Sequence, residues 1–202
     1  TSPVERTNSN ISTIAPNDFG NDGDIDLFVG SLSVVGSYGV NPENLLLEND
    51  GKGNFNNVTA AKAPKLKSIG MTTSAIWEDI DKDNIKDLIV VGEWMSPKLF
   101  KYNGSFFEEI ESNLKEYSGW YNTVEAKDLD NDGDNDLIFG NRGLNSIYKA
   151  NKENPAKMFV NDFDSNGTIE QIFTHTVDGK DKPIHHKKEL TGQIASLKKQ
   201  NL

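Results

Sequence analysis

The sequence predicts an all-β protein made of short antiparallel strands in four repeated units. One acidic nine-residue pattern occurs four times, and each copy runs directly into an apolar stretch of strand length. Between the copies, short segments with a period of two or with many β-branched and aromatic residues are separated by turn formers such as Asn103-Gly104. The composition, 35% hydrophobic and 26% charged over 202 residues, is typical of a globular protein.

The clearest copy of the pattern, residues 128–136, reads Asp-Leu-Asp-Asn-Asp-Gly-Asp-Asn-Asp. Its five carboxylates repel one another unless a cation lies between them, and oxygen ligands favour a hard cation such as calcium. Acids at positions 1, 3 and 5 point inward as the chain curls, and Gly133 at position 6 permits a positive φ. Position 7 offers its carbonyl and Asp136 closes the shell at position 9. An EF-hand needs a glutamate at position 12, where Phe139 stands. The acid at position 9 therefore distinguishes this loop from an EF-hand, and the apolar run that follows predicts a strand instead of a helix.

The same frame begins again at Asp18, Asp79 and Asp162, so successive copies start 61, 49 and 34 residues apart. Position 9 is acidic in every copy. Four copies in register argue against a set of merely solvated acidic turns.

The charge distribution supports a role in holding metal ions. The net charge is −10, and the four copies contain sixteen of the 31 acidic residues, so the rest of the chain is mildly basic. Four divalent ions would add about +8 and bring the chain near neutrality. Such concentrated negative charge excludes nucleic acid as a partner. The absence of cysteine excludes disulfides and thiolate metal sites, and no apolar run is long enough for membrane insertion.

The first two repeats supply most of the expected strands. Residues 1–17 are polar and predict either a frayed start or the remnant of a strand. Strands are then expected at 27–35, 45–47 and 55–59 in the first repeat, and at 71–80, 88–94, 99–102 and 106–110 in the second. Four strands with a metal loop between the first and second, in roughly sixty residues, have the size and order of a propeller blade.

The later repeats are shorter. Strands are expected at 120–126, 137–139 and 146–148 and then at 157–160 and 171–177, followed by a helix at 188–200 with Leu190, Ile194 and Leu197 on one face. We therefore predict a partial, open β-propeller at 1–180, with blades at about 10–60, 66–112, 118–150 and a degenerate fourth at 156–180. Residues 181–202 form a helical extension. An open arc leaves blade edges unpaired, so the isolated segment is expected to self-associate or to cover its own edge. The chain begins Thr1-Ser2-Pro3 without a methionine or signal sequence, and we expect it to be a piece of a longer protein.

The D-x-D-x-D-G-x-x-D loop followed by a Leu-apolar-apolar-Gly strand resembles the FG-GAP and VCBS repeats found in integrin α-subunit propellers and in bacterial exported proteins. The stretch from Phe139 to Ser146 is also similar to a junction in large bacterial proteins that carry a cartilage-acidic-protein-like domain. The resemblance covers most of residues 10–175 and implies Ca²⁺ as the cofactor. Position by position, it implies these metal ligands: Asp18, Asp22, Asp24 and Asp26; Asp79, Asp81, Asp83, Ile85 and Asp87; Asp128, Asp130, Asp132, Asp134 and Asp136; Asp162, Asp164, Asn166, Thr168 and Glu170.

Three copies depart from the family pattern. Gly20 replaces the acid at position 3, Asn84 replaces glycine at position 6, and Asn166 replaces the acid at position 5. Asparagine tolerates a positive φ, so the second copy should still curl. We expect the copy at Asp128 to bind calcium most tightly and those at Asp18 and Asp162 more weakly. Accordingly, Asp130→Ala should destabilise the protein more than Asp164→Ala.

The resemblance implies a calcium-stabilised, non-enzymatic binding or adhesion module of a secreted or surface-anchored protein, extracellular or associated with the periplasm or outer membrane. Its partners would be a protein or glycan at the cell surface and the remaining blades of the longer chain. One alternative is a lectin-like propeller that stacks sugars on Trp77, Trp94, Trp120 or Tyr121, although such aromatics are more often core. Another is part of a calcium-dependent polysaccharide lyase or hydrolase. His175, His185 and His186 give catalysis weak support, since the last two lie in a Lys-rich segment.

Overall fold

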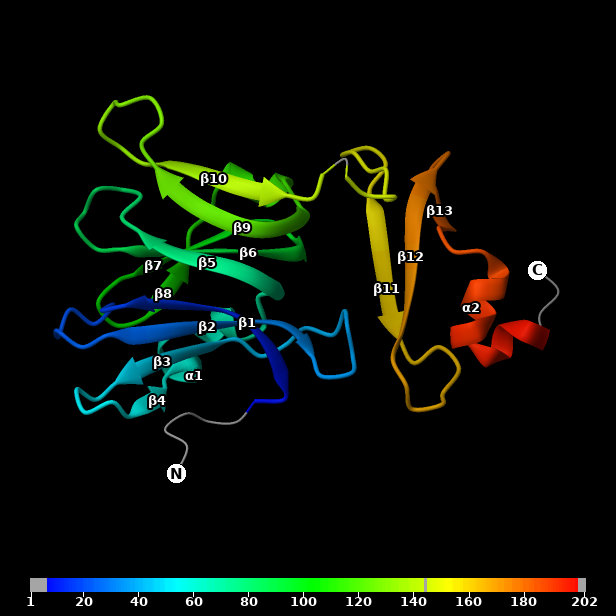
Figure 1. The fold of residues 1–202 in the computed structure, drawn as a ribbon, viewed down its shortest axis with the longest axis horizontal. Coiled ribbons are helices and arrows are strands. Elements are labelled where there is room, and N and C mark those ends of the chain that lie inside the picture. The colour runs from blue at the N-terminus through cyan, green and yellow to red at the C-terminus, as the bar shows by residue number, and fades with distance from the viewer. Residues whose placement is uncertain (1–6, 144, 200–202) are drawn as a thin grey trace. The chain divides into compact units, whose positions relative to one another are not determined.

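The computed structural model describes residues 7–143 and 145–199, and most of its regular structure is strand (Figure 1). Within these residues the strands form three antiparallel sheets and no closed barrel, which confirms an all-β, open partial propeller with a short C-terminal helix. The chain divides into two compact units: residues 7–34 with 41–143, and residues 35–40 with 145–199. No helix in the described part of the chain is long and apolar enough to cross a membrane.

The first repeat is a four-stranded meander in the spatial order β1-β2-β3-β4. Its strands are β1 (Ser9–Asn17), β2 (Asp26–Val34), β3 (Leu45–Asn49) and β4 (Phe55–Asn57). The polar start of the chain therefore contains a full strand, because β1 pairs with β2 along its whole length. Residues 1–6 of the segment that was predicted to be either a frayed start or the remnant of a strand lie outside the described residues.

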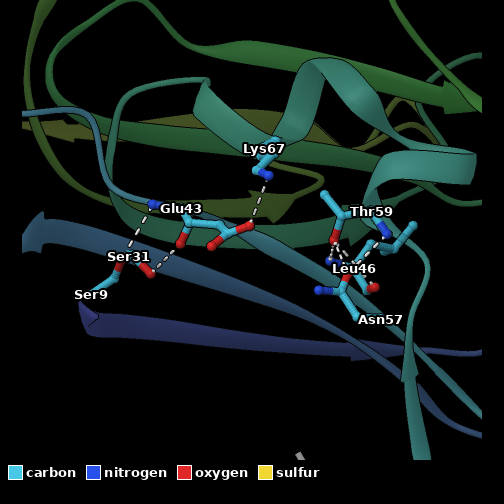
Figure 2. A network of polar contacts seen from close by, with 7 residues as sticks. All are labelled: Ser9, Ser31, Glu43, Leu46, Asn57, Thr59 and Lys67. Carbon is cyan, nitrogen blue, oxygen red and sulfur yellow. Dashed lines mark hydrogen bonds and ion pairs between the residues drawn. The ribbon is translucent and has the colours of Figure 1, made fainter. Parts of the chain in front are cut away.

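Two short helices that the sequence did not predict follow the first repeat: α1 (Thr59–Lys62) and the 3-10 helix η1 (Pro64–Ser68). Thr59 was expected to end a strand. Instead its hydroxyl accepts the Leu46 backbone N–H at 2.8 Å and donates to the Asn57 side-chain oxygen at 2.7 Å (Figure 2). These bonds satisfy the buried hydroxyl and tie the start of α1 to β3.

A second polar group, also drawn in Figure 2, ties η1 to the first sheet. The Glu43 carboxylate pairs with the Lys67 ammonium at 3.2 Å. The Glu43 backbone N–H donates to the Ser9 hydroxyl at 3.2 Å, and its carbonyl accepts the Ser31 hydroxyl at 2.8 Å. The segment that enters β3 is thereby held to both β1 and β2.

The second and third repeats share one six-stranded sheet. Its strands are β5 (Met71–Glu78), β6 (Asp87–Met95), β7 (Lys98–Tyr102), β8 (Phe107–Glu109), β9 (Gly119–Lys127) and β10 (Asp136–Asn141), with the 3-10 helix η2 (Asn113–Glu116) before β9. The third repeat contributes only β9 and β10. It joins the second repeat because the end of β6 pairs with the start of β9, at Glu93 with Trp120 and at Met95 with Gly119. Trp94, between those pairs, has a φ of 60°.

Strand β6 lies at the centre of this unit. Leu88 and Val90 belong to an aromatic-rich core shared with the first repeat, whereas Ile89 and Val91 belong to a second core shared with the third repeat. All four side chains are fully buried. A strand that is covered on both faces requires a continuous apolar run in place of an alternating one, which is the pattern that follows the loop at Asp79.

The other unit contains the fourth repeat, a three-stranded sheet in the order β11-β12-β13. Its elements are β11 (Ala156–Asn161), β12 (Glu170–Val177), β13 (Lys180–Pro183), α2 (Lys187–Gln193) and the 3-10 helix η3 (Ala195–Lys199). The expected helix at 188–200 is broken at Ile194, whose backbone is extended, with φ −111° and ψ 95°. Leu190 and Ile194 are nevertheless both buried, so the predicted apolar face is used. Residues 200–202 lie outside the described residues.

The strand expected at Ser146–Tyr148 is absent from the described residues around it. The Ser146 hydroxyl accepts the Tyr148 N–H at 3.1 Å, and this local turn competes with strand pairing. Tyr148 packs against Phe173 of β12, with ring centroids 5.7 Å apart. The third repeat is thus cut short after its second strand, as the 34-residue spacing predicts. Leu144, within the predicted junction, lies outside the described residues.

Candidate metal centres

The four acidic copies form loops that join the first strand of each repeat to the second. We refer to residues 18–26, 79–87, 128–136 and 162–170 as loops 1, 2, 3 and 4. In each loop, position 9 is the first residue of the second strand and pairs with the last residue of the first strand: Asp26 with Asn17, Asp87 with Glu78, Asp136 with Lys127, and Glu170 with Asn161. Loops 1, 2 and 3 lie at the same end of their strands (Figure 1).

The acid at position 1 organises the curl of every loop. Its carboxylate accepts the backbone N–H of position 6 in all four, at 2.9, 2.8, 3.2 and 2.9 Å from Gly23, Asn84, Gly133 and Gly167. Such bonds hold the position 1 side chain inside the loop, as the predicted ligand arrangement requires. They also stabilise a carboxylate in the absence of a cation.

Two backbone positions in each loop have a positive φ. Position 6 was predicted to need it, and its φ is 92° at Gly23 and Gly133, 86° at Gly167 and 67° at Asn84. Position 4 was not predicted, and its φ is 54–62° at Asn21, Lys82, Asn131 and Ser165. The sequence signal at position 4 is weak because only two of these four residues are asparagine, which tolerates this conformation well.

The acid at position 9 accepts the backbone N–H of position 2 in all four loops. The donors are Phe19, Ile80, Leu129 and Phe163, at 2.9–3.3 Å. Asp26, Asp87 and Glu170 are buried, whereas Asp136 is exposed. Burial raises the pKa of Asp26, and it raises the pKa of Asp87 to about 6.

Three loops bring acidic oxygens close enough to share one cation. One oxygen from each of three acids lies within 4.8 Å of the other two in the groups Asp79–Asp81–Asp87, Asp128–Asp130–Asp132 and Asp162–Asp164–Glu170. Among the described residues, loop 1 forms no such group, in line with Gly20 at its position 3. These groups contain nine of the predicted ligands. The other predicted acidic ligands lie outside these groups among the described residues: Asp83 of loop 2, Asp134 and Asp136 of loop 3, and the four aspartates of loop 1.

Three oxygens in these groups are buried without a hydrogen-bond partner in the described part of the chain: Asp87 Oδ1, Asp164 Oδ1 and Glu170 Oε1. An unpaired buried carboxylate oxygen is costly, and a coordinated cation removes that cost. Oxygen-only donor sets suit Ca²⁺ or Mg²⁺ far better than zinc or copper. The residues at loops 2 and 4 therefore fit a hard divalent cation.

Sequence reasoning missed the lysines around loop 2. Lys101 of β7 forms ion pairs with the carboxylates of Asp81 and Asp83, the latter at 2.7 Å. The hydrogen bonds that Lys101 donates to these carboxylates raise its pKa, and the hydrogen bond from Lys101 lowers the pKa of Asp83. Lys82 of loop 2 pairs with Asp134 of loop 3 at 3.0 Å. The loop pattern alone contains no signal for Lys101, because strand register is needed to place it.

The aromatic residues weighed as sugar platforms separate into two kinds. Trp77 and Tyr121 are buried, and the Trp77 indole N–H donates to the Ala15 carbonyl at 3.0 Å, so both belong to the core. Trp94 and Trp120 are half-buried, with ring centroids 5.2 Å apart, and the Arg142 guanidinium lies 4.6 Å from the Trp120 ring.

The weak histidine candidates have structural contacts. His186 forms a capping box with Glu189 at the start of α2, and the His185 ring packs against Phe173. His175 lies in β12, paired with Ala156 and Lys182.

A family model described as FG-GAP-like repeat matches residues 18–90 and 79–139, which together span more than half of the chain. The two matches begin at position 1 of loop 1 and loop 2, and the second ends inside β10. No curated protein matches the chain significantly.

Proposed function

Because the chain belongs to the FG-GAP-like repeat family, we propose that it is a calcium-stabilised, non-enzymatic binding or adhesion module of a secreted or surface-anchored protein. One observation supports the calcium part most directly. Loops 2 and 4 each place a buried, unpartnered oxygen of the position 9 acid beside two further carboxylates. A carboxylate so placed favours a bound cation over solvent or a protein donor.

Loops 2, 3 and 4 would hold the ion through their side-chain oxygens at positions 1, 3, 5 and 9 and the carbonyl at position 7, and loop 1 would do so without a ligand at position 3, where Gly20 stands. Calcium accepts six to eight oxygens in irregular geometry, whereas magnesium demands a near-octahedral shell and retains several waters. A loop with four or five protein oxygens therefore suits calcium better. The ion would neutralise the acids and fix the hairpin between the first two strands of each repeat, so its role is structural.

Calcium should therefore raise the free energy of unfolding. At a free concentration ~100 times the dissociation constant, each site that binds only the folded chain adds about 2.7 kcal/mol. Thermal denaturation with calcium, magnesium or EDTA, after metal analysis confirms the state of each sample, tests this. We expect calcium to raise the melting temperature by at least several degrees and magnesium to raise it less. Identical melting curves in calcium and in EDTA would refute the calcium role.

The ligand of the module is proposed only by class, as a protein or glycan at the cell surface. The half-buried pair Trp94 and Trp120, with Arg142 beside it, is the observation that favours a glycan, because sugar rings stack on aromatic faces. Binding to a glycan array that is lost in Trp94→Ala would support a lectin-like function. Uniform absence of binding would favour a protein ligand.

A further inference from the structure

Lys101 reaches loop 2 from a different strand of the same repeat. In the β6–β7 register Leu88 lies opposite Phe100, so Lys101 follows at the end of β7 nearest Asp87 and the loop. Its ammonium forms ion pairs with the carboxylates of Asp81 and Asp83, which are positions 3 and 5 of the loop. The register therefore directs a positive charge to two predicted calcium ligands.

The other loops do not share this feature within the described residues. In the first repeat Leu27 lies opposite Leu47, so the residue that corresponds to Lys101 is Glu48, which pairs instead with Lys62. The described residues of the third repeat, 119–143 and 145–150, contain no third strand. In the fourth, β13 pairs with the far end of β12, at Thr174–Val177. Within the part of the chain that the structure describes, loop 2 alone receives a lysine on its position 3 and position 5 carboxylates.

At positions 1, 3, 5 and 9, which would supply the side-chain ligands, loops 2 and 3 are tied because both have aspartates there, whereas the fifth acid of loop 3, Asp134, is predicted to offer only its carbonyl. A tethered ammonium breaks this tie. It occupies two of the four carboxylates, and it would repel a divalent cation placed between them, at an energy that falls only inversely with distance. Calcium must therefore displace the lysine before it can use the full ligand set of loop 2.

We infer that Lys101 is a built-in counter-ion of loop 2 and makes this loop a lower-affinity calcium site than loop 3. The inference rests on the proposed function, since it presumes that the loops bind calcium. Loop 3 fills first as calcium rises, and loop 2 fills only at higher concentration, when the ammonium leaves Asp81 and Asp83. Lys101 thereby sets the calcium range over which the second repeat is fully stabilised.

A calcium titration of the full chain followed by amide NMR reads the two loops separately. The N–H groups of Asn84 and Ile85 bond to the Asp79 and Asp83 side chains and report loop 2. Those of Gly133 and Asp134 bond to Asp128 and Asp132 and report loop 3. In the wild-type chain the loop 2 amides should have the higher calcium midpoint. The reverse order would overturn the inference without any variant.

Substitution of Lys101 provides the decisive comparison. Lys101→Met should lower the calcium midpoint of loop 2 at least about tenfold and leave loop 3 within about twofold. Lys101→Arg, which keeps the charge, should behave like the wild type. Lys98→Met is the matched control, because Lys98 lies on the same strand but pairs with Glu109 at 2.7 Å, away from the loop. It should change neither midpoint.

The outcomes separate the inference from the proposed function. If loop 3 titrates and Lys101→Met leaves the loop 2 midpoint unchanged, the counter-ion role is wrong and calcium binding stands. If Lys98→Met shifts loop 2 as much as Lys101→Met does, the effect is one of net charge and the inference is also overturned. If no loop responds to calcium in the wild-type chain, both the inference and the proposed function fail.

Discussion

The second and third repeats begin their second strands with the same residues, yet the two strands differ in burial. Asp87, Leu88 and Ile89 of β6 are fully buried, whereas in β10 Asp136 is exposed, Leu137 is half-buried and Ile138 is 41% exposed. The loops themselves share their turn geometry and their position 1 and position 9 hydrogen bonds. The conformation of each loop is therefore determined locally, whereas the burial of the strand that follows depends on the strands and repeats packed around it.

The difference has a structural cause. β6 pairs with β7 at Leu88–Val90, and its outer face packs against Tyr121 and Val124 of β9. β10 ends its sheet in the described residues and pairs only with β9. Leu137 and Phe139 contact the core shared with the second repeat, but Ile138 points to the opposite face of the strand.

The largest expected effect compares two isoleucines at the same place in the repeat. Ile89→Ala removes a fully buried side chain and leaves a cavity, which costs about 2–5 kcal/mol of unfolding free energy. Ile138→Ala removes a side chain that is 41% exposed and should cost less than about 1 kcal/mol. Urea denaturation of both variants in saturating calcium measures the difference. Equal losses would mean that Ile138 is covered in solution and that the contrast between the repeats is wrong.

The next effect concerns Asp87 and its response to pH in the calcium-free protein. Because burial raises its pKa from 3.8 to about 6, the folded chain holds this proton to higher pH than the unfolded chain does. Stability from this group is therefore present below the unfolded pKa and is lost as pH rises through about 6. The loss is on the order of 2 kcal/mol. Carboxyls whose pKa is lowered, such as that of Asp83, change the stability only as the pH falls below about 3.8, so they do not obscure the decline through pH 6.

Urea denaturation in EDTA from about pH 4.5 to about 7.5 tests the prediction. Asp87→Asn, which keeps an oxygen for the Ile80 N–H, should flatten the decline in stability. Asp136→Asn, the exposed counterpart in loop 3, should leave the decline unchanged. A decline that survives Asp87→Asn would assign it to another group.

The sequence predicted what the loops determine locally and missed what depends on register. The positive φ at position 6, including Asn84, follows from nine consecutive residues and is confirmed. The acids at positions 1 and 9 also follow from them, and in loops 2 and 4 these two acids lie in the same group. Lys101 could not be placed, because its contact with loop 2 depends on how β6 and β7 align. The prediction of a strand at Ser146–Tyr148 was wrong for a different reason. Its residues suit a strand, but a local turn and packing against Phe173 compete with pairing.

The smallest expected effect compares position 6 in the two loops. Gly133 has a φ of 92° with no neighbouring atom near an added Cβ, so Gly133→Ala meets backbone strain alone and should cost about 1 kcal/mol. Asn84 already occupies this region at 67°, and Asn84→Gly should change stability by less than about 0.5 kcal/mol, because relief of strain and the greater freedom of the unfolded chain oppose each other. Both variants are compared by urea denaturation in EDTA, so that bound metal does not contribute to the stability of the loop. If Asn84→Gly raises stability by more than Gly133→Ala lowers it, the loop 2 backbone is strained and the two loops are not equivalent.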